Sequence, residues 1–203
     1  MRAIALNGTL KPSPSASSTE ALTRFVLGAL AEHGVEGEHV RLVDHHVAPG
    51  VESEAQSPGD GWPEVREKVL AADILVLATP TWLGQISSVT KGALERMDAL
   101  LSETDVDGVP VAYNKVCGFV VVGNEDGAHA CIANMAQAVM DIGFTVPGQA
   151  WTYWNKGPGP GDEVYLTTED REWTHETGRA AAHNLVHAAR ALAAHPIPKP
   201  PNA

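Results

Sequence analysis

The sequence predicts an α/β protein built on a doubly wound, five-stranded parallel sheet with the strand order 2-1-3-4-5. Short apolar runs alternate along the chain with segments in which apolar residues recur at helical spacing, as successive β–α units require. One of the runs, residues 74–78, is apolar throughout, which is typical of a parallel strand buried on both faces, and residues 116–122 predict a further buried strand. The length of 203 residues suits five such units.

The expected strands are short and are bounded by turn residues. In chain order they cover residues 3–6, 38–43, 74–78, 116–122 and 144–153. The first strand ends at Asn7 and Gly8, and Pro147 and Gly148 interrupt the last one. Because strands alternate with helices, we expect a parallel sheet with helices on both faces.

The expected helices carry apolar residues three and four positions apart. In chain order they cover residues 22–30, 65–70, 89–101, 132–140 and 169–194. Gly34 and Gly143 follow two of them as stop signals. Residues 44–61 and the acidic segment 102–110 predict surface loops, and the glycine–proline run 157–161 predicts a rigid loop.

The composition is that of a globular protein with an acidic balance. The chain has 25 acidic and 14 basic residues, a formal net charge of −11, and its basic residues form no patch. A protein that binds nucleic-acid phosphates needs clustered lysine and arginine, so we exclude that class of partner. We expect one domain over residues 1–195 and a frayed, proline-rich tail over residues 196–203.

The apolar runs and the cysteines indicate a cytoplasmic protein. No apolar run approaches the ~18–20 residues that span a bilayer, and the first apolar run is too short for a signal peptide. Cys117 and Cys131 fit no zinc or iron–sulfur spacing, so we expect no metal site. We interpret both as core thiols of a reducing compartment, with a single disulfide as the alternative.

The loop after the first strand has the composition of an anion site. Ligands of doubly wound sheets bind outside the carboxyl ends of the strands, where residues 7–19 are expected. This loop has many hydroxyls, the cation Lys11 and no acid before Glu20, and it leads into a helix whose free amides favour anions. It lacks the glycine spacing of Rossmann and P-loop motifs. The alternative is a serine-rich loop in which Ser18 or Thr19 caps the helix.

Two further loops are expected at the same edge of the sheet. Residues 79–88 carry no charge, and an exposed Trp82 beside a leucine could border a flat aromatic ligand. Simple packing of the tryptophan is the alternative. Residues 123–129 contain two glycines that allow close backbone approach, and Asn124 could hydrogen-bond the edge of a heterocycle. The alternative there is an acidic turn in which Asp126 caps the next helix.

Three sequence motifs coincide with these loops. The first combines residues 8–11 (GTLK) with 17–19 (SST), the second combines 79–84 (TPTWLG) with 91–96 (KGALER), and the third is 123–128 (GNEDGA). In these motifs the chain resembles the flavodoxin-like, FMN-dependent NAD(P)H oxidoreductases, the NADPH-dependent FMN reductase group. The corresponding patterns of that group are a G-S-x-R phosphate loop, a P-x-Y-x-G segment followed by K-x-x-x-D-R, and a third loop at the flavin edge.

The chain departs from these patterns at four positions. Thr9 replaces serine, Lys11 replaces arginine, Trp82 takes an aromatic position and Glu95 takes the aspartate position. Lys11 is a point charge without the planar fork of arginine, so its contact with a phosphate is expected to be looser. A subgroup of the family also resembles this chain over three later segments, 143–147, 154–155 and 157–160.

The resemblance implies a non-covalently bound FMN as cofactor and NAD(P)H as co-substrate. The phosphate would be held by Thr9, Lys11, Ser17, Ser18 and Thr19. The flavin ring would be flanked by Pro80, Thr81, Trp82, Leu83, Gly84, Gly123, Asn124, Glu125, Asp126 and Gly127. Hydride would pass from the nicotinamide through FMN to a small acceptor such as a quinone or a flavin. No side chain is implied as catalytic, because the flavin carries the chemistry.

Two other functions stay open. The acidic charge favours a flavodoxin-type electron-transfer protein without its own NAD(P)H oxidation, since such carriers dock on basic partners. The T-x-T-G-x-T phosphate loop of that group is absent from the sequence. A flavin-free binding module is the third hypothesis. We also expect a homodimer or homotetramer, with Trp151 and Trp154 past the last strand at an aromatic interface.

Several polar residues are interpreted apart from these loops. His45 and His46 lie in a predicted surface loop and are expected in solvent rather than on a metal. His129 lies one turn into a predicted helix and could reach a substrate. Lys91 and Arg96 are expected to pair with acids on or near their helix.

Overall fold

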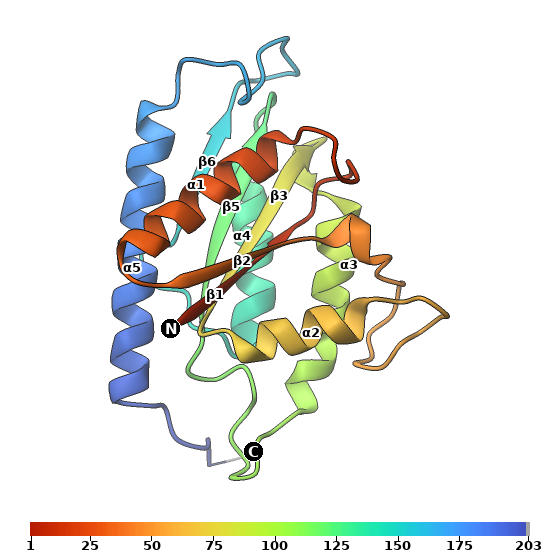
Figure 1. The fold of residues 1–203 in the computed structure, drawn as a ribbon, viewed down its shortest axis with the longest axis vertical. Coiled ribbons are helices and arrows are strands. Elements are labelled where there is room, and N and C mark those ends of the chain that lie inside the picture. Colours follow the sequence, from red (N-terminus) through yellow and green to blue (C-terminus); the bar gives the residue numbers. More distant parts are fainter. Residues whose placement is uncertain (202–203) are drawn as a thin grey trace.

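The computed structural model describes residues 1–201 and contains a sheet of six strands. They are β1 (Arg2–Asn7), β2 (Glu36–Arg41), β3 (Ile74–Trp82), β4 (Gln85–Ile86), β5 (Val116–Gly123) and β6 (Trp151–Asn155). Five strands are parallel in the order β2-β1-β3-β5-β6, and the two-residue β4 pairs antiparallel with β3 (Figure 1). The predicted fold class and the order of the parallel strands are therefore confirmed, while β4 is an addition.

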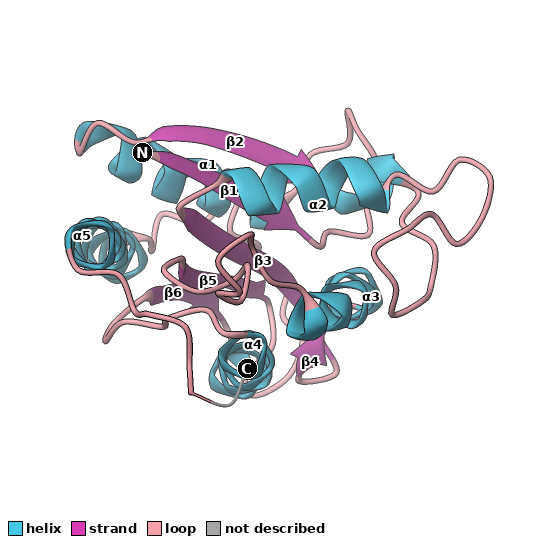
Figure 2. Ribbon diagram, turned by 90° about the horizontal axis from the view of Figure 1, so that it is seen from below, coloured by secondary structure: helices cyan, strands magenta, loops and turns pink. Residues whose placement is uncertain are grey.

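Helices cover both faces of the sheet. They are α1 (Ser18–Glu32), α2 (Trp62–Ala71), α3 (Ser88–Arg96), α4 (Ala128–Ile142) and α5 (Glu172–Ala194), with the 3-10 helices η1 (Leu42–His45) and η2 (Met97–Ser102). One apolar core lies between the sheet and α1 with α5, and a second lies between the sheet and α2, α3 and α4 (Figure 2). Because strand side chains alternate, Ile74 and Val76 of β3 join the first core and Leu75 and Leu77 join the second.

Strand β3 is longer than predicted at its carboxyl end. The apolar run ends at Ala78, but the strand continues to Trp82. The antiparallel pairing of Thr81 with Ile86 in β4 holds this extension in place. The predicted loop 79–88 is therefore a hairpin, and the apolar run alone carried no signal of its pairing partner.

The last strand is shorter than predicted. Thr145 forms an isolated bridge to the start of β5, but β6 begins only at Trp151. Pro147 between them lacks the N–H that a ladder hydrogen bond needs. Trp151 and Trp154 both lie within β6, so the expectation that they lie past the last strand is wrong, whereas the strand predicted over 144–153 already contained Trp151.

Other boundaries differ less. β2 lies earlier than the predicted 38–43, because Arg41 is followed by the 3-10 helix η1. The helix predicted over 89–101 is divided into α3 and η2, and the short helix predicted over 65–70 extends in both directions as α2. The helix predicted over 169–194 begins at Glu172.

The C-terminal tail is attached to the loop before β5. The Ile197 N–H donates to Asn114 Oδ1 at 2.7 Å, and Asn114 Nδ2 donates to the Ile197 carbonyl at 3.2 Å. The expectation of a frayed tail is therefore wrong at Ile197. Residues 202 and 203 of the predicted tail lie outside the described residues.

Cys117 and Cys131 are buried free thiols. Burial raises the pKa of both, so both are protonated and unreactive at neutral pH. The prediction of core thiols is confirmed, and the disulfide alternative is wrong. Within residues 1–201, none of the helices combines the length and the apolar character that crossing a membrane would require.

Candidate functional site

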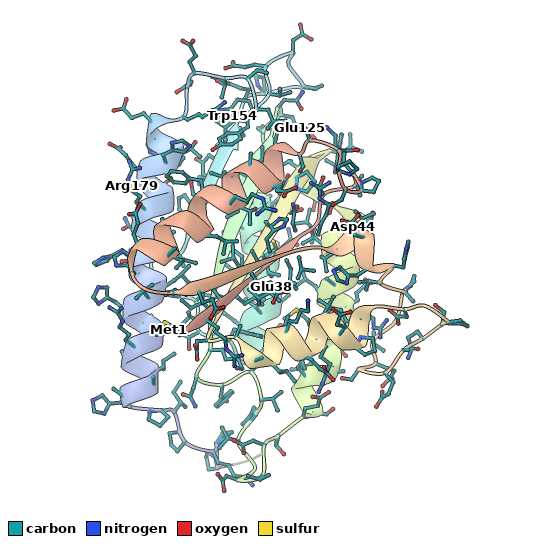
Figure 3. All side chains as sticks on the ribbon, in the orientation of Figure 1. Met1, Glu38, Asp44, Glu125, Trp154 and Arg179 are labelled. Atoms are coloured by element: carbon teal, nitrogen blue, oxygen red, sulfur yellow. The ribbon has the colours of Figure 1, made fainter. Side chains whose placement is uncertain are left out.

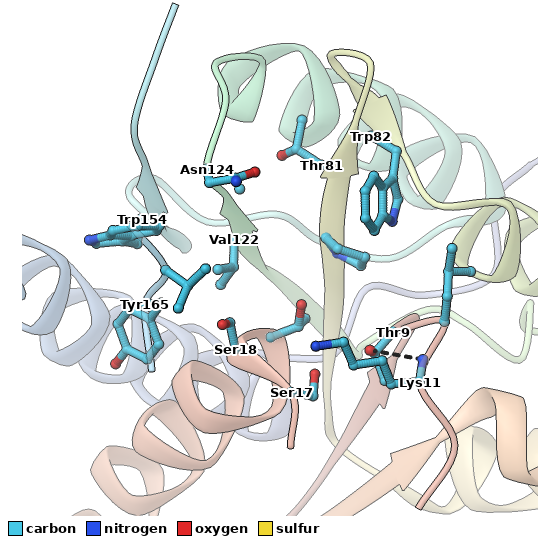
Figure 4. A pocket seen from close by; sticks show the side chains of 15 residues that line it. Thr9, Lys11, Ser17, Ser18, Thr81, Trp82, Val122, Asn124, Trp154 and Tyr165 are labelled. Carbon is cyan, nitrogen blue, oxygen red and sulfur yellow. Dashed lines mark hydrogen bonds between the residues drawn. The ribbon is translucent and has the colours of Figure 1, made fainter. Parts of the chain in front are cut away.

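A pocket opens at the carboxyl ends of β1, β3 and β5, beside the N-terminus of α1 (Figure 4). This edge holds the topological switch point of a doubly wound sheet, where such folds bind ligands. The lining contains these residues named from the sequence: Thr9, Lys11, Ser17, Ser18, Thr19, Pro80, Thr81, Trp82, Gly123 and Asn124. It also contains residues that the sequence analysis did not name as ligand contacts: Leu10, Val122, Trp154, Val164 and Tyr165. Leu83, Gly84, Glu125, Asp126 and Gly127 lie in the adjoining turns and are not part of the lining.

The N-terminus of α1 forms one end of the pocket. Ser17 is the N-cap, because its hydroxyl accepts the Glu20 N–H at 3.2 Å. The alternative in which Ser18 or Thr19 caps the helix is therefore wrong. Both begin the helix instead, and their N–H groups donate to no group within residues 1–201. Free amides at a helix N-terminus are the donors that an anion takes.

The first loop is folded around its own polar groups. The Thr9 N–H donates to Asn7 Oδ1 at 3.0 Å, and the Lys11 N–H donates to Thr9 Oγ1 at 3.3 Å (Figure 4). Lys11 Nζ reaches back to the Ala16 carbonyl at 3.3 Å. These bonds place the one cation of the lining close to the helix N-terminus, where it adds to the attraction for an anion.

Arg41 of β2 supports this loop from below, and the sequence analysis did not name it. Its guanidinium donates to the Lys11 and Ser15 carbonyls, both at 3.0 Å, and pairs with the Glu20 carboxylate. The side chain is buried, so its charge-assisted hydrogen bonds are shielded from water. Arg41 therefore fixes two points of the loop, at Lys11 and Ser15, relative to Glu20 in the first turn of α1.

Gly8 is required because the loop passes close to α3. A Cβ atom on Gly8 would lie 1.8 Å from Thr90 Oγ1, and the Gly8 carbonyl accepts the Ser87 hydroxyl at 2.6 Å. The first and second loops are therefore in direct contact beneath the pocket. The sequence showed the glycine but not its neighbour.

The hairpin of β3 and β4 is bonded to the loop after β5. The Leu83 N–H donates to Glu125 Oε1 at 2.7 Å. Gly127 has φ +114°, and a Cβ there would lie 2.6 Å from the Cα of Gly84. Gly127 is also the N-cap of α4 without a side-chain hydrogen bond, so the alternative in which Asp126 caps that helix is wrong.

The far wall of the pocket comes from β6 and from the irregular segment after it. Trp154 and Tyr165 are buried and lie opposite Trp82 (Figure 4), and Glu125 and Trp154 lie at the same end of the molecule (Figure 3). Asn124 Nδ2 donates to the Gly161 carbonyl at 2.6 Å, and the Gly161 N–H donates to the Asn124 carbonyl at 3.0 Å. Trp154 is thus a wall of the pocket, which contradicts its predicted place in an exposed interface.

The lining of the pocket contains no acidic side chain, and Lys11 is the one charged residue among the lining residues. Two ionisable groups next to the pocket are paired or neutral. Glu20 is paired with Arg24 and Arg41. Burial, and next the charge of Arg24, lower the pKa of His39 to about 4, so His39 is neutral at pH 7. A lining of hydroxyls, amides, one cation and indole rings fits a phosphate monoester joined to a flat ring.

The remaining predicted residues lie outside the lining. Lys91 pairs with Glu95 of its own helix at 3.1 Å, as expected. Arg96 is fully buried and pairs with Asp60 at 2.6 Å. Asp60 belongs to the loop before α2, so the partner of Arg96 does not come from its own helix or from nearby in the chain. The His129 ring packs against the rings of β6 and is not part of the lining.

His45 and His46 also lie outside the lining. His45 is the last residue of η1, and His46 follows it in the left-handed conformation. The Gly61 N–H donates to the His45 carbonyl at 2.9 Å, which closes the loop between η1 and α2.

A parallel doubly wound sheet, a first loop that leads into a helix N-terminus with free amides, and glycine-containing turns after the third and fourth parallel strands are the features of the flavodoxin-like class of flavin nucleotide proteins. Residues 1–159 match the family model described as NADPH-dependent FMN reductase. The chain therefore belongs to the NADPH-dependent FMN reductase family. It is an oxidoreductase of a family that uses FMN and NADPH.

Individual relatives extend the match to the C-terminal part of the chain. The 8-demethyl-8-aminoriboflavin-5'-phosphate synthase of Streptomyces davaonensis is 34% identical over 203 residues, covering 95% of this chain and 78% of the relative. A crystal structure of RosB, solved with the bound intermediate 8-demethyl-8-formylriboflavin-5'-phosphate, has a TM-score of 0.84 and 32% identity, covering 97% of this chain and 82% of that one.

A third relative is much longer than this chain. The divalent metal cation transporter MntH of Mycobacterium bovis is 37% identical over 207 residues, which cover 98% of this chain. This chain spans 30% of the length of that relative.

Proposed function

We propose that the protein binds FMN in this pocket and passes reducing equivalents from NADPH to a small acceptor such as a quinone or a flavin. The observation that carries the proposal is that one pocket contains both the free helix amides of Ser18 and Thr19 and, across from them, a wall of indole rings. The first supplies donors for a phosphate monoester, and the second supplies apolar surface for a flat ring.

In this proposal the first loop holds the phosphate. The amides of Ser18 and Thr19, the hydroxyl of Thr9 and the ammonium of Lys11 would bind its oxygens. Arg41 would hold the loop in the binding conformation without contact to the ligand. Because the donors are fixed before binding, little ordering entropy is lost when the phosphate enters.

The two following turns would border the isoalloxazine ring. All four of Thr81, Trp82, Gly123 and Asn124 line the pocket. Thr81 and Gly123 are direct neighbours on β3 and β5, because a Cβ on Gly123 would lie 2.8 Å from the Thr81 Cβ. Bound FMN supplies the hydride chemistry of such a site. The chain contributes orientation, exclusion of water on the indole side and hydrogen-bond donors at the ring edge, and no side chain is needed as a nucleophile.

The binding half of the proposal is tested by titrating the protein with FMN and with riboflavin. FMN should bind at least tenfold more tightly, a difference of about 1.4 kcal/mol, because riboflavin lacks the phosphate. The double variant Ser18→Ala and Thr19→Ala serves as a comparison that leaves the amides in place but removes the hydroxyls. Equal affinity for the two flavins would overturn the phosphate assignment.

The redox half is tested by steady-state NADPH oxidation with quinone, free flavin and azo acceptors in separate assays. Turnover with at least one acceptor is expected. If the FMN-loaded protein oxidises NADPH with none of these acceptors, that result would favour a flavodoxin-type electron carrier without its own NAD(P)H oxidation, to which the acidic charge is also suited.

A second candidate function is a chemical change of the flavin itself. Two observations favour it: the 34% identity to an enzyme named as a synthase of an aminoriboflavin phosphate, and the similarity to a structure that holds a formylriboflavin phosphate. In that case riboflavin-5'-phosphate would be the substrate. Mass spectrometry of the flavin after incubation distinguishes the two functions, because a reductase returns FMN at unchanged mass.

We further infer a cytoplasmic location and a homodimeric or homotetrameric assembly. The location is supported by two buried free thiols, and the assembly by the stacked rings of Trp151 and Tyr153 on the edge strand β6. Cell fractionation tests the location. Sedimentation tests the assembly, for which a monomer would be the contrary result.

A further inference from the structure

Tyr165 lies in the segment between β6 and α5, beyond residues 1–159 that match the family model. Its ring is buried and lines the pocket with Val164 and Trp154, on the side next to Ser18 (Figure 4). Neither periodicity nor a motif marks this residue in the sequence. The chain nevertheless places a large aromatic side chain from an irregular segment into the wall of the proposed flavin site.

The Tyr165 hydroxyl is bonded to a histidine of the next helix. The distance from Tyr165 Oη to His175 Nε2 is 2.9 Å. The His175 ring stacks on Phe25 of α1, with ring centroids 3.9 Å apart and an interplanar angle of 12°. His175 is therefore held between α1 and α5 and presents one nitrogen to the tyrosine.

Further contacts restrict the tyrosine ring. Trp154 meets it edge-on, with centroids 6.1 Å apart, and the guanidinium of Arg171 lies over it at 5.0 Å. Trp154 Nε1 in turn donates to the Asp170 carbonyl at 3.0 Å. These contacts connect the residues of the wall to one another. The bond from the tyrosine hydroxyl to His175 is the side-chain hydrogen bond that joins Tyr165 to α5.

We propose that His175 is a positioning residue for flavin binding, which acts by holding the ring of Tyr165 in the pocket wall. The inference rests on the proposed binding of FMN in this pocket. Without the hydrogen bond, the tyrosine ring would rotate away from the wall or lose its fixed position, and apolar surface available to the bound ligand would be lost.

Matched substitutions separate the hydrogen bond from the stacking. His175→Phe keeps a ring against Phe25 but removes the partner of the hydroxyl, whereas His175→Gln keeps a hydrogen-bonding group near the Nε2 position without the ring. Tyr165→Phe removes the hydroxyl and keeps the ring. Binding of FMN is measured by fluorescence titration, and thermal unfolding of the flavin-free protein reports on stability separately.

We expect His175→Phe and Tyr165→Phe to weaken FMN binding about tenfold each, with the double variant no weaker than either one, because both remove the same interaction. His175→Gln should restore most of the affinity. Wild-type affinity in His175→Phe, or additive losses in the double variant, would overturn the inference while the proposed function stands. Failure of the unsubstituted protein to bind FMN would overturn both.

Discussion

The side chain of Glu125 accepts the backbone N–H of Leu83 at 2.7 Å, which joins the turn after β3 to the loop after β5. The two residues are 42 positions apart in the chain, and the same turns also approach each other where a Cβ on Gly127 would lie 2.6 Å from the Gly84 Cα. Trp82 and Asn124 line the pocket and directly precede the two bonded residues, so the bond holds together the turns that carry them.

Glu125→Ala should weaken FMN binding, because the loss of a hydrogen bond to a charged acceptor costs about 1.5–3 kcal/mol when both partners are ordered. Glu125→Gln is the matched control, since its amide oxygen still accepts the Leu83 N–H. Fluorescence titration with FMN measures both. Wild-type binding by the alanine variant would show that the turns hold their positions without this bond.

Arg41→Met should loosen the first loop and lower the affinity for FMN about tenfold, or 1.4 kcal/mol. The aliphatic side chain fills the space but makes none of the bonds to Lys11, Ser15 and Glu20. Arg24→Gln is the control, because Arg24 also pairs with Glu20 but is exposed. Calorimetric titration measures the affinities, and equal values for the two variants would contradict the role given to Arg41.

Gly8→Ala should destabilise the fold by roughly 1–3 kcal/mol, since the added methyl group collides with Thr90. Gly28→Ala in α1 is the control, because a Cβ there meets nothing within 4 Å. That change should stabilise the protein by about 0.5–1 kcal/mol. Urea unfolding measures both, and an unchanged free energy of unfolding in Gly8→Ala would be the contrary result.

Acid should destabilise the protein through Asp60. Burial alone would raise the pKa of this carboxyl group, but hydrogen bonds from the Gln56 amide, the Arg96 guanidinium and the Ala48 and Trp62 amides outweigh it and lower the pKa well below 3.8. A lowered pKa in the folded state means that the carboxylate contributes stability above the unfolded value of 3.8. This contribution is lost as the pH falls through the folded pKa.

Asp60→Asn tests this prediction. It leaves the buried Arg96 without its counter-ion, so the free energy of unfolding at pH 7 should fall by about 3 kcal/mol. Its dependence on pH below 4 should also become shallower. Glu67→Gln on the exposed face of α2 is the control. Identical pH profiles for the wild type and Asp60→Asn would contradict the assignment.

The sequence predicted the sheet because the strands that form its centre are mostly apolar. Residues 74–78 and 116–122 were predicted as buried strands from their composition, and parallel strands place the loops at their carboxyl ends along one edge of the sheet. Boundaries that depend on pairing were not predictable in this way. Trp82 is part of β3 because it pairs with Gln85 of β4, a partner that no local pattern reveals.

The residues that line the pocket were predictable where they belong to continuous loops and not where they come from elsewhere in the chain. Thr9 and Lys11 lie on the loop after β1, and Ser18 begins the helix that directly follows this loop. Arg41 reaches that loop from β2, and Tyr165 comes from a segment without periodicity, so only the folded chain brings them to the pocket. Arg41 holds the first loop in place and Tyr165 forms part of the pocket wall. Neither role is marked by a motif or by a local composition in the sequence.

The most direct measurement is the anaerobic mixing of the FMN-loaded protein with NADPH while the visible absorption band of the flavin is followed. An FMN-dependent NADPH oxidoreductase should lose this band in a single-turnover reaction, and readmitting an acceptor should restore it. A band that persists with both NADPH and NADH would contradict the proposed reaction, even if FMN binds in the pocket.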